Sequence, residues 1–384
     1  MYKVYNTQYQ IASSLKEFLL IAIPNIRKTQ LKIIPFIIIG MLLSESAVAS
    51  DIAKSLKDEF SLIQHESVIR RITRFFKNKL FDPYSFYDKI IRFVISRYKV
   101  KHKDKKVHII FDHMFSHDNY VVFMITMRIG KQGIPLWFRC FKENQSNAFQ
   151  ESLILEGISY VADLFGKDYN LIFLADRWFN SVRVMKLIAS FDYTFRLRLK
   201  RNIKVLIYDK KEGRKIWKFL GDIKHYEWHS SRYEVLLSDE RYEVYIVCSK
   251  KNGTDDPWII CTNKNPESAI KDYGYRFGGI ESVFKNQKSN GLNMENTCNA
   301  SEKYFTSMYT MVCFCVLFMT ILGTDYTKNT RVYKNVKMKT HKKDKNGIKT
   351  RIMSLFNIGL SLFHLAYMSS KYIRIPYKFI LYDV

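Results

Sequence analysis

The chain has 384 residues, of which 47% are hydrophobic and 15% aromatic, so it can bury real cores and a disordered protein is excluded. Lys and Arg total 62 against 36 Asp and Glu, which leaves a formal net charge of +26. A positive excess of this size predicts a polyanionic partner, with nucleic acid ahead of an anionic membrane surface.

The cysteines and the N-terminus bear on where the protein works. The six cysteines include no CxxC pair, so a disulfide scaffold is excluded and we expect reduced thiols. Residues 1–18 lack the pattern of a signal peptide, which predicts a cytoplasmic protein. Residues 304–324 are uncharged and long enough to span a membrane, but their Thr and Ser residues favour a buried core helix. No membrane partner is expected.

The first element along the chain is a helical region, residues 1–100, which we interpret as a DNA-binding domain. Its apolar residues recur at three- and four-residue spacing. A helix starting near Glu66 would place Arg70, Arg71 and Arg74 on a basic face suited to DNA, with apolar residues packed inward. A solvated helix face is the alternative interpretation.

Residues 101–325 predict an α/β domain with a mixed central sheet, because three strands are followed by alternating helices and strands. The expected strands are 106–112, 119–129, 134–141, 169–176 and 193–200, and the expected helices are 148–165 and 181–191. Residues 200–265 interrupt this alternation with short strands separated by turn residues, which predicts an antiparallel β-rich insertion.

Helical patterning returns after the insertion, in residues 267–291 and 302–322. Residues 326–384 form a third region, a basic segment followed by an apolar helix over 352–368. The run of Lys and Arg over residues 328–351 predicts contact with flanking or target DNA without sequence preference, because such a run reads phosphates and not base edges.

Three acids are candidates for a shared site. Asp112 and Asp176 each follow an apolar run that reads as a strand, so neighbouring strands would bring their carboxylates to one edge of the sheet. Glu281 lies on a later predicted helix beside basic residues. Carboxylate oxygens suit Mg²⁺, with Mn²⁺ as a substitute, and such ions support phosphodiester chemistry.

These residues resemble the DDE transposases of bacterial insertion sequences, specifically the IS-four group. That family has a ribonuclease H-like core with Asp, Asp and Glu in this order, and a β-rich insertion before the Glu. Its helical signature is Tyr, two residues, Arg, three residues, Glu, six residues, Lys. Tyr273 and Arg276 have the expected gap, and so do Glu281 and Lys288, whereas residues 277–280 supply four residues in place of three.

The resemblance, which spans roughly residues 45–325, implies a role for each residue. Asp112, Asp176 and Glu281 would be the catalytic residues and the metal ligands. Tyr273, Arg276 and Lys288 would contact phosphates at the transposon end, and Lys285 is a further basic residue on the same helix. Trp178 would stack on a flipped base, with packing in the core as its alternative.

Other residues are weaker candidates for a metal or catalytic site. His113, His117 and Asp118 form a possible zinc cluster beside Asp112, but they fall in a predicted turn and not on a helix. Asp118 also competes with Asp112 as the first acid. His225 and His229 have metal-ligand spacing but lie in the β insertion, so we interpret them as ordinary insertion residues.

The function expected from the whole sequence is that of a DNA transposase. It would bind the terminal inverted repeats of an insertion sequence, cut there with Mg²⁺, and join the freed 3′ hydroxyl to target DNA, acting as a homodimer in the end-paired complex. Two alternatives stay open. One is a stand-alone ribonuclease H-like nuclease or resolvase, and the other is a non-catalytic DNA-binding protein derived from a transposase.

Overall fold

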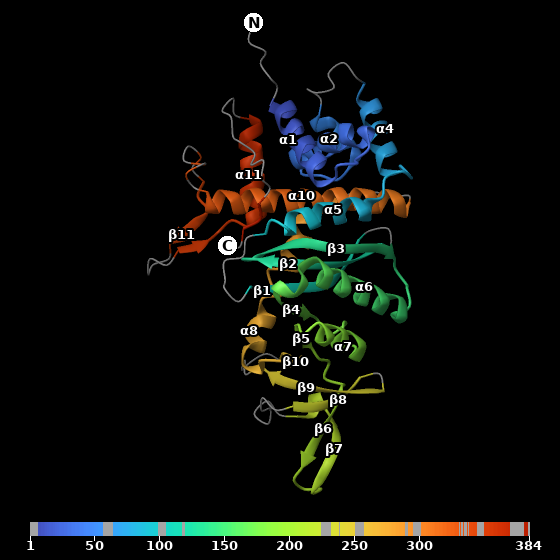
Figure 1. Cartoon of the computed structure of the whole chain (residues 1–384), viewed down its shortest axis with the longest axis vertical. Coiled ribbons are helices and arrows are strands. Elements are labelled where there is room, and N and C mark those ends of the chain that lie inside the picture. Colours follow the sequence, from blue (N-terminus) through green and yellow to red (C-terminus); the bar gives the residue numbers. More distant parts are fainter. Residues whose placement is uncertain are drawn as a thin grey trace.

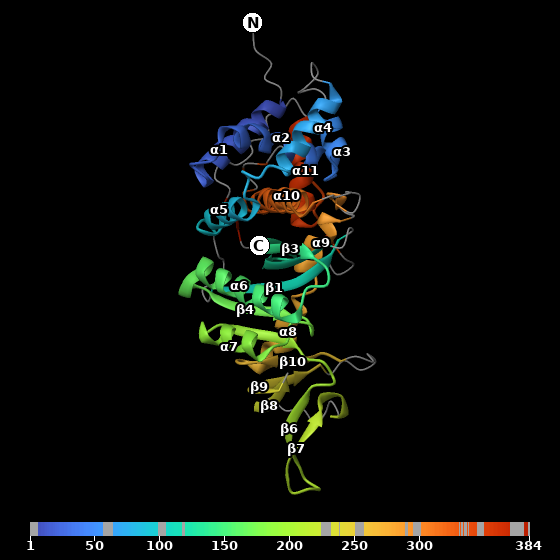
Figure 2. The ribbon, with the colours of Figure 1, turned by 90° about the vertical axis from the view of Figure 1, so that its right-hand side faces the viewer.

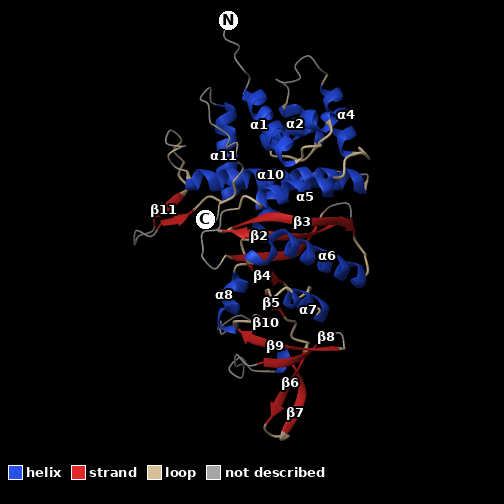
Figure 3. Cartoon of the chain, viewed as in Figure 1, coloured by secondary structure: helices blue, strands red, loops and turns tan. Residues whose placement is uncertain are grey.

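The computed structural model describes most of the chain. The described residues are 7–56, 64–98, 105–116, 120–223, 232–237, 239–249, 257–288, 291–294, 301–329, 331, 333, 336, 338–343, 349–368 and 380–382. Within them one group of helices gathers at one end of the molecule, and the large sheet with the remaining helices fills the rest, as Figure 3 shows.

The helical end combines the two ends of the chain (Figure 1). The central helix is α10, which packs against α2, α4, α5 and α11. The predicted boundaries near residues 100 and 325 therefore do not separate independent cores, because the N-terminal helices bury their apolar faces on helices from the C-terminal part of the chain. The helices are α1 (Thr7–Ala22), α2 (Lys28–Ser44), α3 (Ala49–Ser55), α4 (His65–Phe76), α5 (Pro83–Ile95), α10 (Glu302–Lys328) and α11 (Leu355–Met368).

Helix α10 is apolar on all sides because it is enclosed by protein. Two of its buried hydroxyl groups bond inside the helix, since Thr310 donates to the carbonyl of Thr306 at 2.8 Å and Thr320 to that of Val316 at 2.7 Å, whereas the buried Ser307 hydroxyl has no hydrogen-bond partner in the described part of the chain. By length and composition α10 could cross a membrane, and so could α2 and α3 together across a 91° bend. The most apolar 18 residues of α10 are all buried within the protein, as expected of a core helix.

The sheet runs from the helical layer to the far end of the molecule in the order β3-β2-β1-β4-β5-β10-β9-β8-β6-β7. Strands β1, β4 and β5 are parallel to one another, and β2 is antiparallel to both β1 and β3. This half of the sheet contains β1 (Lys106–Phe115), β2 (Tyr120–Ile129), β3 (Gln132–Lys142), β4 (Asn170–Ala175) and β5 (Thr194–Arg198).

Helices cover the two faces of this half of the sheet. Figure 2 shows α6 and α7 on one face and α8 and α9 on the other. Their bounds are α6 (Asn147–Phe165), α7 (Val182–Ser190), α8 (Ala269–Gly274) and α9 (Ile280–Gln287). The expected α/β domain with a mixed sheet is thus observed.

The β-rich insertion prolongs the central sheet. Its strands are β6 (Lys204–Asp209), β7 (Arg214–Phe219), β8 (Arg232–Leu237), β9 (Glu240–Cys248) and β10 (Ile259–Thr262). They are antiparallel, and β10 joins them to the rest of the sheet by pairing with β5. A separate hairpin of β11 (His341–Lys343) and β12 (Lys349–Arg351) projects from the helical end.

Two local expectations were wrong. Strand β1 does not end at Asp112, because its pairing with β2 continues to Phe115 opposite Val121. The helical pattern over residues 267–291 does not form one helix, because the chain turns between α8 and α9. Both differences change how the candidate site is assembled.

Candidate active site

The first two acids meet at an interruption in the parallel pairing. Strands β1 and β4 pair in register up to Phe111 opposite Ala175, and Asp112 and Asp176 are the next residues of the two strands. Strand β4 ends there, whereas β1 continues along β2 alone. The two carboxylates therefore lie side by side where the sheet opens.

The third acid is held in place by a close contact between α9 and the sheet. A Cβ on Gly133 would come within 2.6 Å of the Gly279 carbonyl oxygen, and a Cβ on Gly279 within 2.2 Å of Ile110 Cδ1. The Gly133 amide also donates to Ser282 Oγ at 3.1 Å. At Gly133 a Cβ would meet backbone, so glycine is required there for this approach, which places the first turn of α9 and with it Glu281.

The turn between α8 and α9 accommodates the additional residue that separates this sequence from the family signature. Gly278 has a φ of +85°, a conformation that side chains with a Cβ rarely adopt. The Gly279 amide donates to the Arg276 carbonyl at 3.2 Å, which closes the turn. Arg276 and Glu281 therefore lie on either side of a tight turn and face the same space.

Arg276 lies among all three acids. Its Nη2 donates a short hydrogen bond to Asp112 Oδ2 and lies 3.9 Å from Asp176 Oδ2, while its Nη1 lies 3.7 Å from Glu281 Oε1. The guanidinium is almost fully buried, with a side-chain exposure of 8%, whereas Glu281 is half exposed. The structure thus brings the predicted acids together, with a cation between them.

Both aspartates use their two oxygens differently. Asp112 Oδ1 accepts from the amide of His113 at 2.9 Å, and Asp176 Oδ1 accepts from the amide of Arg177 at 2.6 Å. The backbone thereby orients each carboxylate, and its Oδ2 is left to face Arg276. Arg198, which the sequence analysis did not single out, adds a second cation 4.0 Å from Asp176 Oδ1.

The electrostatics of Asp112 reflect this crowding. Burial raises the pKa of Asp112, and the nearby carboxylates of Asp176 and Glu281 raise it further. Arg276 and the hydrogen bond from His113 lower the pKa, but the net direction is upward. Burial is thus the main cause of the raised pKa of Asp112, and each neighbouring acid has a smaller effect on it than Arg276.

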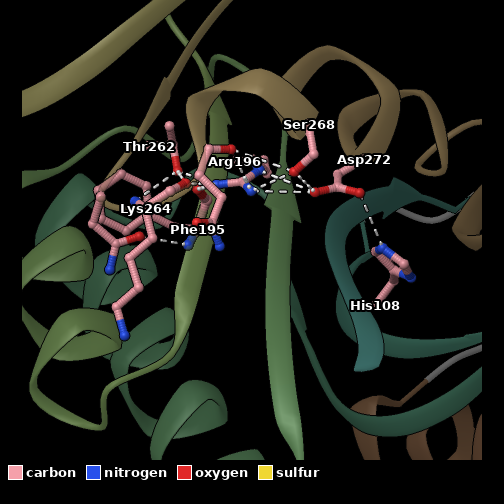
Figure 4. Close-up of polar contacts among 9 residues, drawn as sticks. His108, Phe195, Arg196, Thr262, Lys264, Ser268 and Asp272 are labelled. Atoms are coloured by element: carbon pink, nitrogen blue, oxygen red, sulfur yellow. Dashed lines mark hydrogen bonds and ion pairs between the residues drawn. The ribbon is translucent and has the colours of Figure 1, made fainter. Parts of the chain in front are cut away.

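A buried arginine anchors the helix that precedes Arg276. Figure 4 shows Arg196 of β5 between Thr262 and Lys264 on one side and Ser268 and Asp272 on the other. Arg196 is 1% exposed and donates to Asp272 Oδ2 from Nε at 3.3 Å and from Nη2 at 3.2 Å. The sequence analysis missed this residue, although an arginine within the apolar run of β5 was a signal for a buried ion pair.

Asp272 links this network to β1. Its Oδ1 lies 3.6 Å from His108 Nε2, and its Oδ2 also accepts from Ser268 Oγ at 2.9 Å. Burial raises the pKa of Asp272, but His108, Ser268 and Arg196 outweigh burial and lower it overall. A charged Asp272 thus ties α8 to β1 and β5, and through α8 it positions Arg276.

Tyr273, which the resemblance implied as a phosphate contact, is buried in this structure. Its side chain is wholly buried and packs edge-on against Trp258, with ring centroids 5.2 Å apart. Burial raises its pKa to about 12. In this conformation neither Tyr273 nor the buried Arg276 can reach an external phosphate, because both side chains point into the protein.

Three other predicted DNA contacts are accessible. Trp178 is 76% exposed, so the alternative of core packing is wrong, and Lys200 Nζ lies 4.4 Å from its ring centroid. Lys285 is exposed on α9, and Lys288 is partly exposed at the end of that helix. All three belong to segments that carry an acid of the site.

The basic helix near residue 66 is α4. Arg70, Arg71 and Arg74 are exposed, and Arg70 is 3.5 Å from Glu66 in a pair typical of a solvated surface. Val68, Ile72, Phe75 and Phe76 are buried on the opposite face. The helix therefore presents a basic face to the solvent. It precedes all three acids in the sequence.

The described residues do not support a zinc site built on histidine. His113 packs against Phe123, Phe141 and Phe179, and burial lowers its pKa to about 4. His117, Asp118, His225 and His229 lie outside the described residues.

The resemblance of this chain to known proteins is found among solved structures. No family model matches the sequence, and no curated protein matches it. Among solved structures, the chain is similar to a piggyBac transposase, in the structure described as a synaptic complex with hairpin DNA. The identity is 11% and the TM-score 0.46, over 95% of this chain and 80% of that one.

Proposed function

We propose that this protein is a DDE-type DNA transposase of the insertion-sequence class. The observation that carries the proposal is the convergence of Asp112, Asp176 and Glu281 on one guanidinium, from two parallel strands and a helix beyond a long insertion. Three carboxylates from such distant segments repel one another, and a structural role would not require them to meet.

The strand order supports the same class. A sheet in the order β3-β2-β1-β4-β5, with β2 antiparallel to its neighbours, is what we expect of a ribonuclease H-like core. The insertion begins after β5 and ends with β10. Glu281 follows it in the sequence, on α9. This chain order matches the arrangement that the sequence resemblance implied.

The donor set fits a hard divalent cation. The three side chains offer only carboxylate oxygens, the ligands that Mg²⁺ and Mn²⁺ prefer, and each directs one oxygen toward a single positive group. Among the described residues, no three acidic, His or Cys side chains are already arranged to hold a metal ion. When bound, Mg²⁺ would activate a nucleophile and stabilise the leaving oxygen.

The remaining residues would hold DNA. Lys285 and Lys288 would contact phosphates beside the acids, and Trp178 would stack on a base displaced from the duplex. The basic face of α4 would bind the terminal inverted repeat, and the Lys-rich segment 328–351 would bind flanking or target DNA. Cut-and-paste transposition by an end-paired homodimer is the activity proposed for this assembly.

The test is DNA cleavage by the purified protein with Mg²⁺ or Mn²⁺, on duplexes carrying the DNA that flanks the gene. Asp112→Asn, Asp176→Asn and Glu281→Gln should abolish cleavage while DNA binding persists, since neutral amides compensate dications poorly. Asp118→Asn is the control and should still cut. If all three single variants cut normally, the active-site proposal is wrong, and if only Asp118→Asn is inactive, the first acid is misassigned.

A further inference from the structure

Arg276 is in an unusual position for a residue expected to grip DNA. Its guanidinium is buried, and its two terminal nitrogens face all three acids. Arginine stays protonated under any condition in which the protein is folded, so it cannot escape burial by losing its charge. Its positive charge is therefore compensated by the same carboxylates that would compensate a metal ion.

The geometry of the acids does not depend on Arg276 alone. Backbone amides hold Asp112 Oδ1 and Asp176 Oδ1, and the contact between Gly133 and Gly279 places the first turn of α9. The two aspartates would keep their backbone hydrogen bonds if the guanidinium moved away, and the half-exposed Glu281 carboxylate would remain on the first turn of α9. Arg276 Nε has no hydrogen-bond partner in the described structure, so the guanidinium is held by its ion pairs with the three acids and by the Phe277 ring, whose centroid is 5.9 Å away.

We propose that Arg276 is a positioning residue that holds the place of the divalent cation in the metal-free protein and withdraws from the carboxylates when the metal binds. The inference rests on the proposed active site and adds a competition within it. In the metal-free protein the guanidinium lies within 3.9 Å of an oxygen of each acid, in the space that a shared cation would need. A metal ion must then displace the guanidinium, which weakens apparent metal affinity.

The experiment measures metal binding directly by titration calorimetry with Mn²⁺, together with thermal unfolding with and without the metal. Arg276→Gln should unfold at a lower temperature than the wild type without metal, because the acids lose their counter-ion. It should bind Mn²⁺ more tightly, by roughly tenfold, since one charge-assisted contact no longer competes. Its gain in unfolding temperature on adding Mn²⁺ should exceed that of the wild type.

Two further variants make the result specific. Arg276→Lys keeps the charge, but a single ammonium cannot serve three acids at once, so its Mn²⁺ affinity should lie between those of the wild type and Arg276→Gln. This variant also serves if Arg276→Gln does not fold. Arg183→Gln removes the same charge at an exposed pair with Glu151 and should leave Mn²⁺ affinity unchanged.

The failures are distinguishable. If the wild type and Arg276→Gln bind Mn²⁺ equally well, and Asp112→Asn abolishes binding in both backgrounds, the competition is disproved while the metal site stands. If Mn²⁺ binding is absent from the wild type and from both Arg276 variants, or survives Asp112→Asn, the proposed active site itself is wrong. Tighter binding by Arg276→Gln that is lost on adding Asp112→Asn supports both.

Discussion

Gly133 and Gly279 lie in direct backbone contact between strand β3 and the turn that leads into α9. Gly133→Ala would place a Cβ 2.6 Å from a carbonyl oxygen that cannot move without shifting α9. We expect a loss of about 1–3 kcal/mol in the free energy of unfolding, the usual cost of overpacking. We also expect slower DNA cleavage, because Glu281 moves with the helix.

Denaturant unfolding and cleavage rates would check this prediction. Gly274→Ala is the matched control, since its nearest neighbouring atom would be Trp258 Cζ3 at 3.9 Å, an ordinary contact. The control should be neutral or slightly stabilising, because Gly274 ends a helix. Equal behaviour of the two variants would mean that the contact does not position α9.

Replacing only one member of the buried pair Arg196 and Asp272 should strongly lower the free energy of unfolding. Arg196→Met leaves Asp272 buried without its main partner, and we expect a loss of about 3–5 kcal/mol in the free energy of unfolding. Arg214→Met removes an exposed partner of Glu212 and should change stability by less than about 1 kcal/mol. Urea denaturation of both variants would show the difference, and a small effect of Arg196→Met would exclude it as the anchor of α8.

Trp178 should contribute to DNA binding but not to folding. Because the ring is 76% exposed, Trp178→Ala should leave the free energy of unfolding within about 0.5 kcal/mol of the wild type. Loss of a stacked base should weaken binding to a DNA end by about 1–3 kcal/mol. Tyr208→Ala, at another exposed ring, is the control in a titration with labelled DNA. Matching affinities for the wild type and Trp178→Ala would remove the stacking role.

The basic face of α4 is tested by the salt dependence of end binding. The double variant Arg70→Ala with Arg74→Ala should bind the terminal repeat more weakly and with a shallower dependence on salt, because fewer counterions are released. Lys89→Ala with Lys167→Ala removes two exposed charges elsewhere and provides the comparison. An identical salt slope for both double variants would place α4 outside the interface.

The local pattern of the sequence determined most of the secondary structure. Apolar runs bounded by turn residues predicted the strands over 106–198 to within a few residues, and helical spacing predicted α6 and α7 closely. The insertion was also evident, because its strands are separated by turn residues. Each of these signals depends on neighbours along the chain, which is why they could be interpreted without the fold.

Only the tertiary structure decided what surrounds each of these residues. The acids were visible in the sequence, but the burial of Arg276 among them and of Tyr273 beside them depends on the turn at Gly278 and on packing of α9 against Gly133. The continuation of β1 past Asp112 is set by pairing with β2. The N-terminal helices pack against α10, although the two segments are more than 200 residues apart in the sequence. Contacts between distant segments leave no periodic signal in either segment, so their partners become known only when the chain is folded.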